Sequence, residues 1–227
     1  MPSEQLLSAS VQDYAKAVYA LEARGGAPVS TNDLAARLGV TPGSVSGMLR
    51  KLAEVGLLEH EPYRGVRLTD EGRRAALEVL RHHRLLELFL AQELGMSWDR
   101  VHAEAEVLEH VLSEELEQLI AGRLGDPAVD PHGDPIPTAA FEIDERQTHS
   151  LDELAVGAVG RFVRVSDSDP EMLRYLADHG IMLGTRLEVI DRQPFAGPVF
   201  VRFGEREHPI GGGLACAMRI ETEGDTR

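Results

Sequence analysis

Cysteine is almost absent from this sequence, and long apolar runs and a recognisable secretion signal are missing. Cys216 is the only cysteine among 227 residues, so no disulfide can form within the chain, which fits a reducing cytoplasm. No stretch approaches the roughly 18 apolar residues of a membrane helix. The N-terminal MPSEQLLSASVQDY lacks a basic region followed by an apolar core. We therefore expect a cytoplasmic protein without a membrane partner, in which Cys216 is a small buried residue and not a catalytic thiol.

Sequence patterns of common catalytic sites are also missing. The chain has no His-Glu-x-x-His zinc motif, no Gly-x-Ser-x-Gly nucleophile elbow and no glycine-rich phosphate loop. The glycines at 211–213 are interpreted as a turn inside a small β-barrel. We expect neither an enzyme nor a small-molecule substrate.

Acidic residues outnumber basic ones and are unevenly distributed. The formal net charge of -15 argues against nonspecific binding to nucleic acid. Residues 1–76 contain nine Lys/Arg and nine Asp/Glu, whereas residues 77–140 contain four and thirteen, together with five histidines. Residues 141–227 contain ten and sixteen. The acidic excess is therefore concentrated in the middle of the chain, beside histidines.

Three helices are predicted at the N-terminus. Apolar residues at helical spacing predict the first over residues 6–23, and a second, short helix follows over about 30–39. The third begins with Thr41 as N-cap and Pro42 at the first helical position. Two short helices joined by a tight, glycine-containing turn are typical of a helix-turn-helix, although a plain helical hairpin gives the same pattern.

A β-hairpin is predicted directly after these helices. Two strand-like pieces flank the turn signal at Pro62–Gly65, and the arginines of this wing are Arg64 and Arg67. The helices and the basic wing together predict a winged-helix DNA-binding domain over residues 1–75.

The rest of the sequence changes from helical to strand-like periodicity near residue 151. Long amphipathic helices are predicted over 69–95 and 98–124, followed by the proline-rich loop DPAVDPHGDPIP. RFVRV, RLEVI, PVFVRF and LACAMRI are typical of short strands around one helix, PEMLRYLADHG, which predicts a small β-barrel. We expect a mainly α protein with a helical domain over 76–140, a linker over 141–150 and the barrel over 151–227.

The stretch HAEAEVLEH, residues 102–110, concentrates histidine and glutamate beside an apolar helix face. At about 100° per residue, its ligand-type side chains fall within one arc of about 100°; they are His102, Glu106, Glu109 and His110. His83 and Glu87 share a face of the preceding helix. Such carboxylates would repel one another unless a cation neutralised them, which predicts a divalent metal site, with a solvated acidic face as the alternative.

The order of these features resembles the diphtheria toxin repressor family of metal-dependent transcription regulators. The likeness covers residues 5–221, and VHAEAEVLEH and PHGDPIP carry it most strongly. It implies a winged helix, a helical dimerisation and metal-binding domain, and a C-terminal SH3-like domain of the ferrous-iron transport A type. It also implies a homodimeric repressor of metal-uptake genes that binds palindromic double-stranded operator DNA.

The resemblance implies two metal sites. The primary ligands would be Asp13, Glu106, Glu109 and His110. The second site would use His83, Glu87 and His102, with Asp167, Asp169 or Glu171 of the SH3-like domain as candidates to complete it. The iron-responsive branch has Met and Cys where this chain has Asp13 and Glu106, and oxygen donors favour Mn²⁺ over the alternative, Fe²⁺; other divalent transition metals would bind in vitro. Lys16 stands where manganese regulators have a further acid, which argues against a closely spaced two-manganese cluster.

The predicted mechanism centres on Asp13, which lies on the first helix of the DNA-binding domain. Metal bound there and by the helical domain would fix the spacing of the two recognition helices. DNA contacts are expected from Thr41, Ser44, Ser46, Gly47, Arg50, Lys51, Arg64 and Arg67. Gly47 replaces a base-reading Gln of the iron branch. Two alternatives stay open: a regulator with purely structural metals, and a metalloenzyme or metal-storage protein.

Overall fold

A computed structural model of the chain describes residues 7–61, 64–144 and 146–223. The chain forms two compact units. The first comprises Met1–His83, Val107–Glu114 and Pro137–Glu142, and the second comprises Arg84–Glu106, Glu115–Ile136 and Ile143–Arg227. None of the described helices combines the length and the apolar character that a membrane crossing requires.

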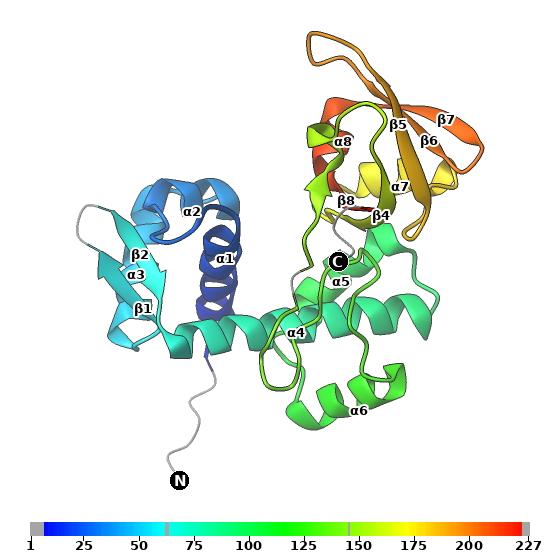
Figure 1. Ribbon diagram of the computed structural model, residues 1–227. Coiled ribbons are helices and arrows are strands. Elements are labelled where there is room, and N and C mark those ends of the chain that lie inside the picture. The colour runs from blue at the N-terminus through cyan, green and yellow to red at the C-terminus, as the bar shows by residue number, and fades with distance from the viewer. Residues whose placement is uncertain (1–6, 62–63, 145, 224–227) are drawn as a thin grey trace. The chain divides into compact units, whose positions relative to one another are not determined.

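The first unit contains the predicted helices and hairpin (Figure 1). The elements are α1 (Ala9–Gly25), α2 (Thr31–Leu38), α3 (Pro42–Glu54), β1 (Leu58–Glu61) and β2 (Gly65–Leu68). The Ser30 side chain caps α2 by accepting from the backbone N–H of Asp33, and Gly39 ends it in the left-handed region at φ 65°. Thr41 caps α3 by accepting from the Ser44 N–H. These residues confirm the predicted starts of both short helices and the predicted end of α2 near Gly39.

The wing is a two-stranded antiparallel hairpin fixed to the helices by a short bridge. Leu58 pairs with Leu68 at its base, and Val66 pairs with Val29, which precedes α2. Gly65 has a φ of 133°, and a Cβ there would lie 2.1 Å from the carbonyl oxygen of Val29, so only glycine fits. Pro62 and Tyr63 of the predicted turn lie outside the described residues.

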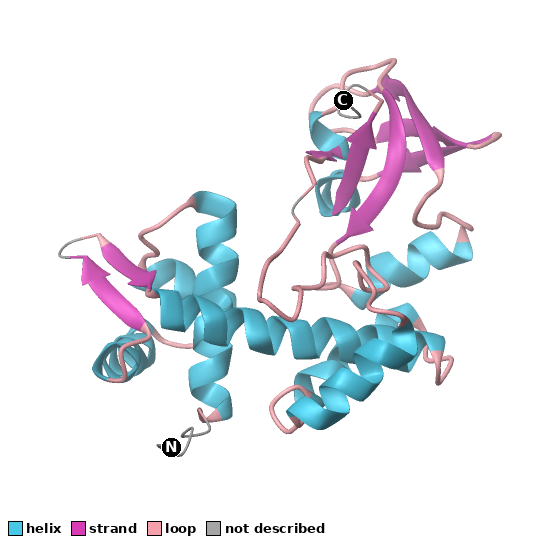
Figure 2. Ribbon diagram, turned by 60° about the horizontal axis from the view of Figure 1, so that its bottom comes forward, coloured by secondary structure: helices cyan, strands magenta, loops and turns pink. Residues whose placement is uncertain are grey.

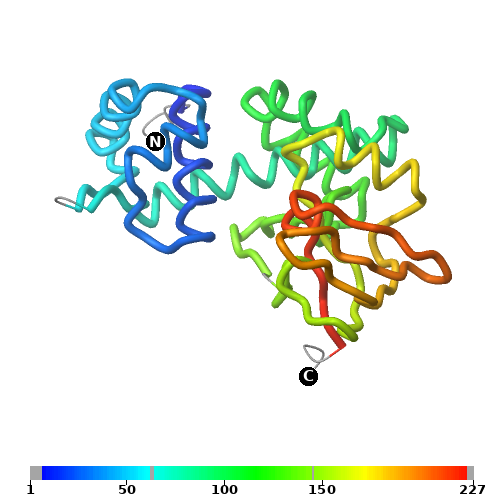
Figure 3. Tube along the Cα trace, turned by 90° about the horizontal axis from the view of Figure 1, so that it is seen from above, coloured from blue at the N-terminus to red at the C-terminus, as the bar shows by residue number. Residues whose placement is uncertain are grey.

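One apolar core joins the helices to the wing, because α1, α2 and α3 bury their helical stripes against each other and against β1 and β2. In the Cα trace these helices gather as one blue cluster (Figure 3). Fully buried members are Ala15, Val18, Leu34, Val45 and Leu52. Burial of the α3 stripe leaves the opposite, polar face of that helix exposed.

The middle of the chain holds three helices where the sequence predicted two. They are α4 (Asp70–Gln92), α5 (Trp98–Leu108) and α6 (Glu114–Leu124). The prediction of one helix over 98–124 was wrong, because residues 109–113 form a turn. Ser113 followed by two glutamates is a helix-start signal that the apolar periodicity concealed. The stripe predicted across this region is also only partly buried: Leu108 and Leu116 are exposed.

The C-terminal part of the second unit is a six-stranded antiparallel sheet with two short helices, whose strands Figure 2 draws in magenta. The elements are β3 (His149–Ser150), the 3₁₀ turn η1 (Leu151–Glu153), β4 (Val159–Val165), α7 (Pro170–Asp178), β5 (Arg186–Arg192), β6 (Val199–Phe203), β7 (Arg206–Ile210), α8 (Gly212–Ala217) and β8 (Met218–Thr222). The strand order is β3-β8-β4-β5-β6-β7, with β3 and β7 at the ends. Among the described residues the sheet is therefore open, and the predicted closed barrel is confirmed only as a small antiparallel β-domain.

Three local predictions in this domain were wrong. LACAMRI is not one strand, because Leu214–Ala217 belong to α8, and Gly211 is the N-cap of that helix instead of a barrel turn. Cys216 is exposed on α8 and not buried. Periodicity cannot separate a short apolar helix from a strand. Strand β7 was missed because REHPI is polar and contains a proline, which an edge strand tolerates.

Candidate metal centre

Three ligand-type side chains meet in the first unit. Asp13 lies on α1, and Glu109 and His110 lie in the turn directly after α5. His110 Nε2 is 2.9 Å from Asp13 Oδ1 and 3.5 Å from Glu109 Oε1. Each of the three offers one ligand atom within 4.8 Å of the others. The end of α5 at Leu108 is what allows two consecutive residues to face the same point.

Hydrogen bonding orients the His110 ring. Its Nδ1 donates to Gln12 Oε1 at 2.7 Å, which leaves Nε2 directed at Asp13. A histidine whose second nitrogen is held in this way presents its other nitrogen to a metal in a fixed direction. Because Gln12 and Asp13 are neighbours on α1, that helix both orients the imidazole and supplies a carboxylate beside it.

Glu109 is the buried anion of this cluster. Its side chain is fully buried, and it accepts a hydrogen bond from Lys16 Nζ at 2.6 Å while its second oxygen contacts His83 Nδ1. Burial raises the pKa of the Glu109 carboxyl, but the hydrogen bond from His83 and the charge of Lys16 outweigh it and hold the pKa below its ordinary value. An ionised, buried carboxylate with a cation beside it is suited to exchange that cation for a metal ion. His83, predicted for the second site, is thus placed against Glu109 in the first unit.

A second set of ligand-type side chains converges in the second unit. His102 Nδ1 on α5 is 3.1 Å from Glu87 Oε1 on α4 and 3.0 Å from Asp167 Oδ2, which follows β4. The hydrogen bond to Asp167 and then that to Glu87 raise the pKa of His102 to about 10. Within the second unit the structure therefore brings Glu87 and His102 together with Asp167, one of the three candidates from the C-terminal domain.

The sequence reasoning missed two members of this cluster, Asp130 and His132. Both are buried in the loop that contains PHGDPIP, and with Glu87 they form a third group of converging ligand atoms. His132 Nε2 donates to the carbonyl of Trp98 at 2.7 Å, while its Nδ1 faces Glu87 Oε2 at 3.7 Å and has no hydrogen-bond partner among the described residues. A buried imidazole nitrogen left without a partner fits a metal ligand, because burial without a bond is unfavourable.

The conformation of that loop explains its motif. Gly133 has a φ of 87°, and a Cβ there would lie 2.0 Å from the carbonyl oxygen of Val163 on β4. The preceding residue is tied to the same strand, since the Val165 N–H donates to the His132 carbonyl at 2.9 Å. The glycine therefore allows the close approach that sets His132 beside Glu87.

Arginines offset part of the acidity around this loop. Arg84 Nε is 3.8 Å from Asp130 Oδ2, and both Arg84 and Arg164 lie 3.4 Å from Asp134 Oδ1. Burial, followed by the carboxylates of Asp134 and Glu87, nevertheless raises the pKa of Asp130 well above its ordinary value. Burial lowers the pKa of His132, but the Glu87 carboxylate and the charge of Asp130 raise it to about 9. The raised pKa values favour the protonated forms of Asp130 and His132.

The remaining predicted ligands are exposed or already act as a helix cap. Glu106 lies on α5, one turn after His102, with its Oε1 3.9 Å from His102 Nε2, and its side chain is exposed. Asp169 caps α7 by accepting from the Glu171 N–H at 2.9 Å, and Glu171 itself is exposed. Asp169 already has a structural role as a cap, so it is a weaker candidate than Asp167.

The predicted DNA contacts lie on exposed parts of α3 and the wing. All eight side chains or positions are exposed: Thr41, Ser44, Ser46, Gly47, Arg50, Lys51, Arg64 and Arg67. Some of them are already hydrogen bonded, since Ser46 Oγ donates to the carbonyl of Pro42 at 2.9 Å. On the wing, Arg67 lies 2.8 Å and Arg64 3.6 Å from the carboxylate of Glu61. Phosphate contacts by these arginines would compete with Glu61.

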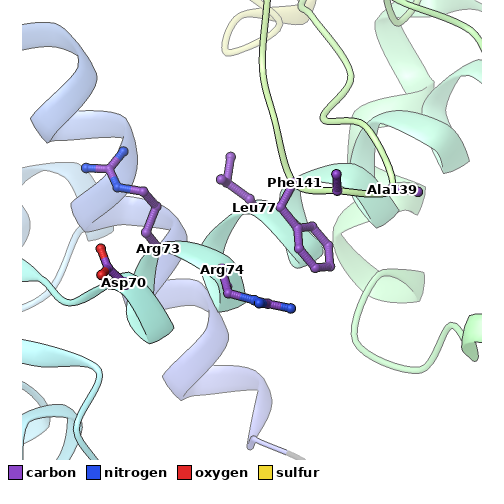
Figure 4. Close-up of a pocket in the computed structure, with 7 residues that line it drawn as sticks. Asp70, Arg73, Arg74, Leu77, Ala139 and Phe141 are labelled. Atoms are coloured by element: carbon purple, nitrogen blue, oxygen red, sulfur yellow. The ribbon is translucent and has the colours of Figure 1, made fainter.

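The first unit also has an open pocket of about 450 Å³, drawn in Figure 4. One face of α4 forms one wall, and the loop 139–141 forms the other. The guanidinium of Arg74 lies 5.5 Å from the ring centroid of Phe141. None of the metal-ligand candidates lines this pocket, so it is separate from the cluster around Glu109.

Comparisons with known proteins agree with this arrangement. Family models match three parts of the chain: the iron dependent repressor N-terminal DNA binding domain (residues 6–66), the iron dependent repressor metal binding and dimerisation domain (69–138), and the FeoA domain (149–222). The iron-dependent repressor IdeR of Mycobacterium tuberculosis (strain ATCC 25618 / H37Rv) is 30% identical over 221 residues, covering 92% of this chain and 95% of that protein. The diphtheria toxin repressor of Corynebacterium glutamicum is 31% identical over 219 residues, with 92% and 94% covered.

Solved structures give the same likeness. A manganese-dependent transcriptional repressor in complex with manganese superposes with a TM-score of 0.86 at 44% identity, covering 93% of this chain and 99% of that one. The manganese regulator SloR superposes with a TM-score of 0.77 at 30% identity, covering 94% and 98%. These relatives are regulators of transcription and not enzymes.

Proposed function

Because this chain belongs to the iron-dependent repressor family of metal-dependent DNA-binding regulators, we propose that it is a manganese-activated, homodimeric repressor of metal-uptake genes. The observation that carries the proposal is the 2.9 Å approach of Asp13 on α1 to His110 in the turn after α5. It joins a residue within the DNA-binding family match to one within the metal-binding and dimerisation match.

The ligand assignment follows the two clusters. Asp13, Glu109 and His110 form the activating site, and Glu106 is the further ligand that the family resemblance implies. The second site contains Glu87, His102 and Asp167, to which we add Asp130 and His132, and His83 remains a candidate there. A divalent ion bound at either cluster would neutralise the carboxylates and accept imidazole lone pairs.

Manganese is favoured over iron by the donor atoms. Asp13 and Glu106 supply oxygen at two positions of the activating site, and hard oxygen donors suit Mn²⁺ better than sulfur donors do. A solved relative at 44% identity carries manganese. Lys16 contacts Glu109 at 2.6 Å, and its ammonium repels a second cation close to the first, so we propose one activating ion per site.

The DNA-binding domain is coupled to the site through α1. Val11, Tyr14, Ala15 and Val18 bury one face of α1 in the winged-helix core, so α1 moves with α3 and the wing. When a metal ion holds Asp13 beside Glu109 and His110, the winged-helix core can no longer turn freely relative to the turn after α5. In a two-fold symmetric dimer this restriction sets the distance between recognition helices, which must match half-sites about 34–36 Å apart on the operator.

The proposal is tested by metal-dependent operator binding. An operator is selected from a randomised duplex library in the presence of Mn²⁺, and its affinity is then measured by fluorescence anisotropy with Mn²⁺ and with EDTA. Coupling free energies of about 1–3 kcal/mol predict roughly 5- to 150-fold tighter binding with Mn²⁺. Equal affinity in both conditions, or failure to select any sequence, would contradict a metal-activated repressor.

A further inference from the structure

Two histidines from separate elements meet on the C-terminal domain, and neither is among the ligand candidates described above. His179 is the C-cap of α7, and His208 lies on β7. Their ring centroids are 5.7 Å apart, with the ring planes at 83°. The Tyr175 ring stacks on His179 at 4.1 Å, and Phe203 lies 6.1 Å from His208, so each imidazole is held by an aromatic neighbour.

The hydrogen bonding of His179 fixes which nitrogen is available. Its Nδ1 lies 2.8 Å from the backbone oxygen of Tyr175. A carbonyl oxygen only accepts, so Nδ1 carries the hydrogen and Nε2 of the neutral ring carries the lone pair. Metal-binding histidines commonly donate their second N–H to a backbone carbonyl in this way, which orients the ring and raises its basicity.

His208 has an uncommitted imidazole. Its ring is half-buried, and within the described part of the chain it makes ring contacts but no side-chain hydrogen bond. Burial, together with the charge of Arg206, holds the pKa of His208 below its ordinary value. This favours the neutral imidazole, which has a lone pair on one nitrogen.

The spacing of the rings suits one shared ion. Zn–N distances near 2.0–2.1 Å in tetrahedral geometry place two imidazole centroids about 5 Å apart, close to the 5.7 Å observed here. The ion would also lie at the C-terminus of α7, where the helix dipole favours positive charge. We propose that His179 and His208 form a surface site for Zn²⁺, Ni²⁺ or Cu²⁺, with water in the remaining coordination positions.

The donor set separates this site from the two clusters described above. Imidazole nitrogen suits Zn²⁺, Ni²⁺ and Cu²⁺, whereas Mn²⁺ prefers carboxylate and water oxygen. The site therefore takes metals other than the activating one, and its loss should leave Mn²⁺-dependent operator affinity unchanged. Failure of this inference and failure of the proposed function are thus distinguishable.

Retention on immobilised Ni²⁺ tests the pair, because the resin reaches surface histidines but not buried ligands. The untagged full chain is compared with His179→Ala, His208→Ala and the double variant, and His60→Ala on the exposed face of β1 is the matched control. If both rings hold one ion, each single variant lowers Ni²⁺ affinity at least tenfold, the double variant loses no more, and His60→Ala changes little. Small additive losses would show independent histidines and overturn the proposal.

A crystal soaked in Zn²⁺ locates the ion directly. We expect an anomalous peak about 2 Å from Nε2 of His179 and from one nitrogen of His208. A peak on one ring only, or none, would contradict the shared site. His179→Gln and His208→Gln keep a polar side chain, so their Ni²⁺ retention settles the test if either alanine variant fails to fold.

Discussion

Replacing Lys16 with methionine tests whether its ammonium neutralises Glu109 in the way that we propose for the activating metal. Lys16 Nζ lies 2.6 Å from Glu109 Oε1, and the Glu109 side chain is fully buried. Methionine has a similar length and no charge. In the variant, Glu109 therefore keeps the hydrogen bond with His83 but loses the one from Lys16. The negative charge of the buried Glu109 carboxylate is then largely unneutralised until a cation binds.

The size of the effect follows from that burial. Removing one partner of a buried ion pair costs about 3–5 kcal/mol. Lys16 is partly exposed and His83 remains, so we expect about 2–3 kcal/mol. In a chain of this size that corresponds to a melting temperature roughly 4–12 °C lower without metal. A metal ion restores the compensation, so Mn²⁺ should bind about 30- to 150-fold more tightly to the variant.

Thermal melts in chelator and Mn²⁺ titration calorimetry measure both quantities. Lys51→Met is the matched control, because Lys51 is the only other lysine and is exposed on α3. An unchanged melting temperature in chelator would refute the buried-charge argument. Weaker Mn²⁺ binding by Lys16→Met would show that the ammonium assists the metal site instead of competing with it.

Three further results are expected. Because the pKa values of His102 and His132 are raised to about 10 and about 9, both rings are protonated at pH 7 and each must lose a proton to bind metal. Metal affinity at this cluster should therefore rise about a hundredfold per pH unit below pH 9 and about tenfold per unit between pH 9 and 10. Calorimetry in buffers of different ionisation enthalpy would detect the proton release. Gly133→Ala places a Cβ 2.0 Å from a β4 carbonyl oxygen and should lower the free energy of unfolding in urea by more than about 3 kcal/mol. Its control, Gly180→Ala, has a φ of 68° and open space and should cost about 1 kcal/mol. Equal losses would contradict the steric argument. Glu61→Gln should release Arg67 for phosphate contact and strengthen operator binding about two- to tenfold, with a steeper salt dependence. An operator affinity equal to that of the unmodified protein, measured by fluorescence anisotropy, would show that the wing does not contact DNA.

Local sequence signals were sufficient for the winged helix. Ser30, Gly39, Thr41 and Pro42 act through bonds or dihedrals within a few residues of themselves, so their roles can be deduced without the tertiary structure. The position of the hairpin followed from the same kind of local pattern. In contrast, the requirement for glycine at position 65 depends on Val29, more than thirty residues earlier, and no local signal reveals it.

The convergence of Glu109 and His110 was predicted, but not the geometry that produces it. Treating 98–124 as one helix placed Glu109 and His110 on a continuous helical face, whereas they lie in a turn after Leu108. Both residues still converge with Asp13. They are positioned by the end of α5 at Leu108 and not by a continuous helical face. The convergence of Asp13 with them is a tertiary contact across nearly a hundred residues, which only the family resemblance suggested.

Asp130 and His132 were missed because a loop has no periodicity to analyse. PHGDPIP was recognised as a motif, yet its glycine has a reason only once β4 lies against it. The same limitation applies to α8 and β7, where burial and edge position decide between helix, strand and turn.

Operator affinity of Asp13→Asn over a range of Mn²⁺ concentrations tests most directly whether the activating metal couples α1 to the turn after α5. Asparagine keeps the shape of the side chain and removes its charge, and Glu104→Gln, exposed on α5, is the matched control. We predict that Asp13→Asn folds normally and loses most of the Mn²⁺-dependent gain in affinity, while Glu104→Gln keeps it. A full Mn²⁺-dependent gain in Asp13→Asn would contradict the account.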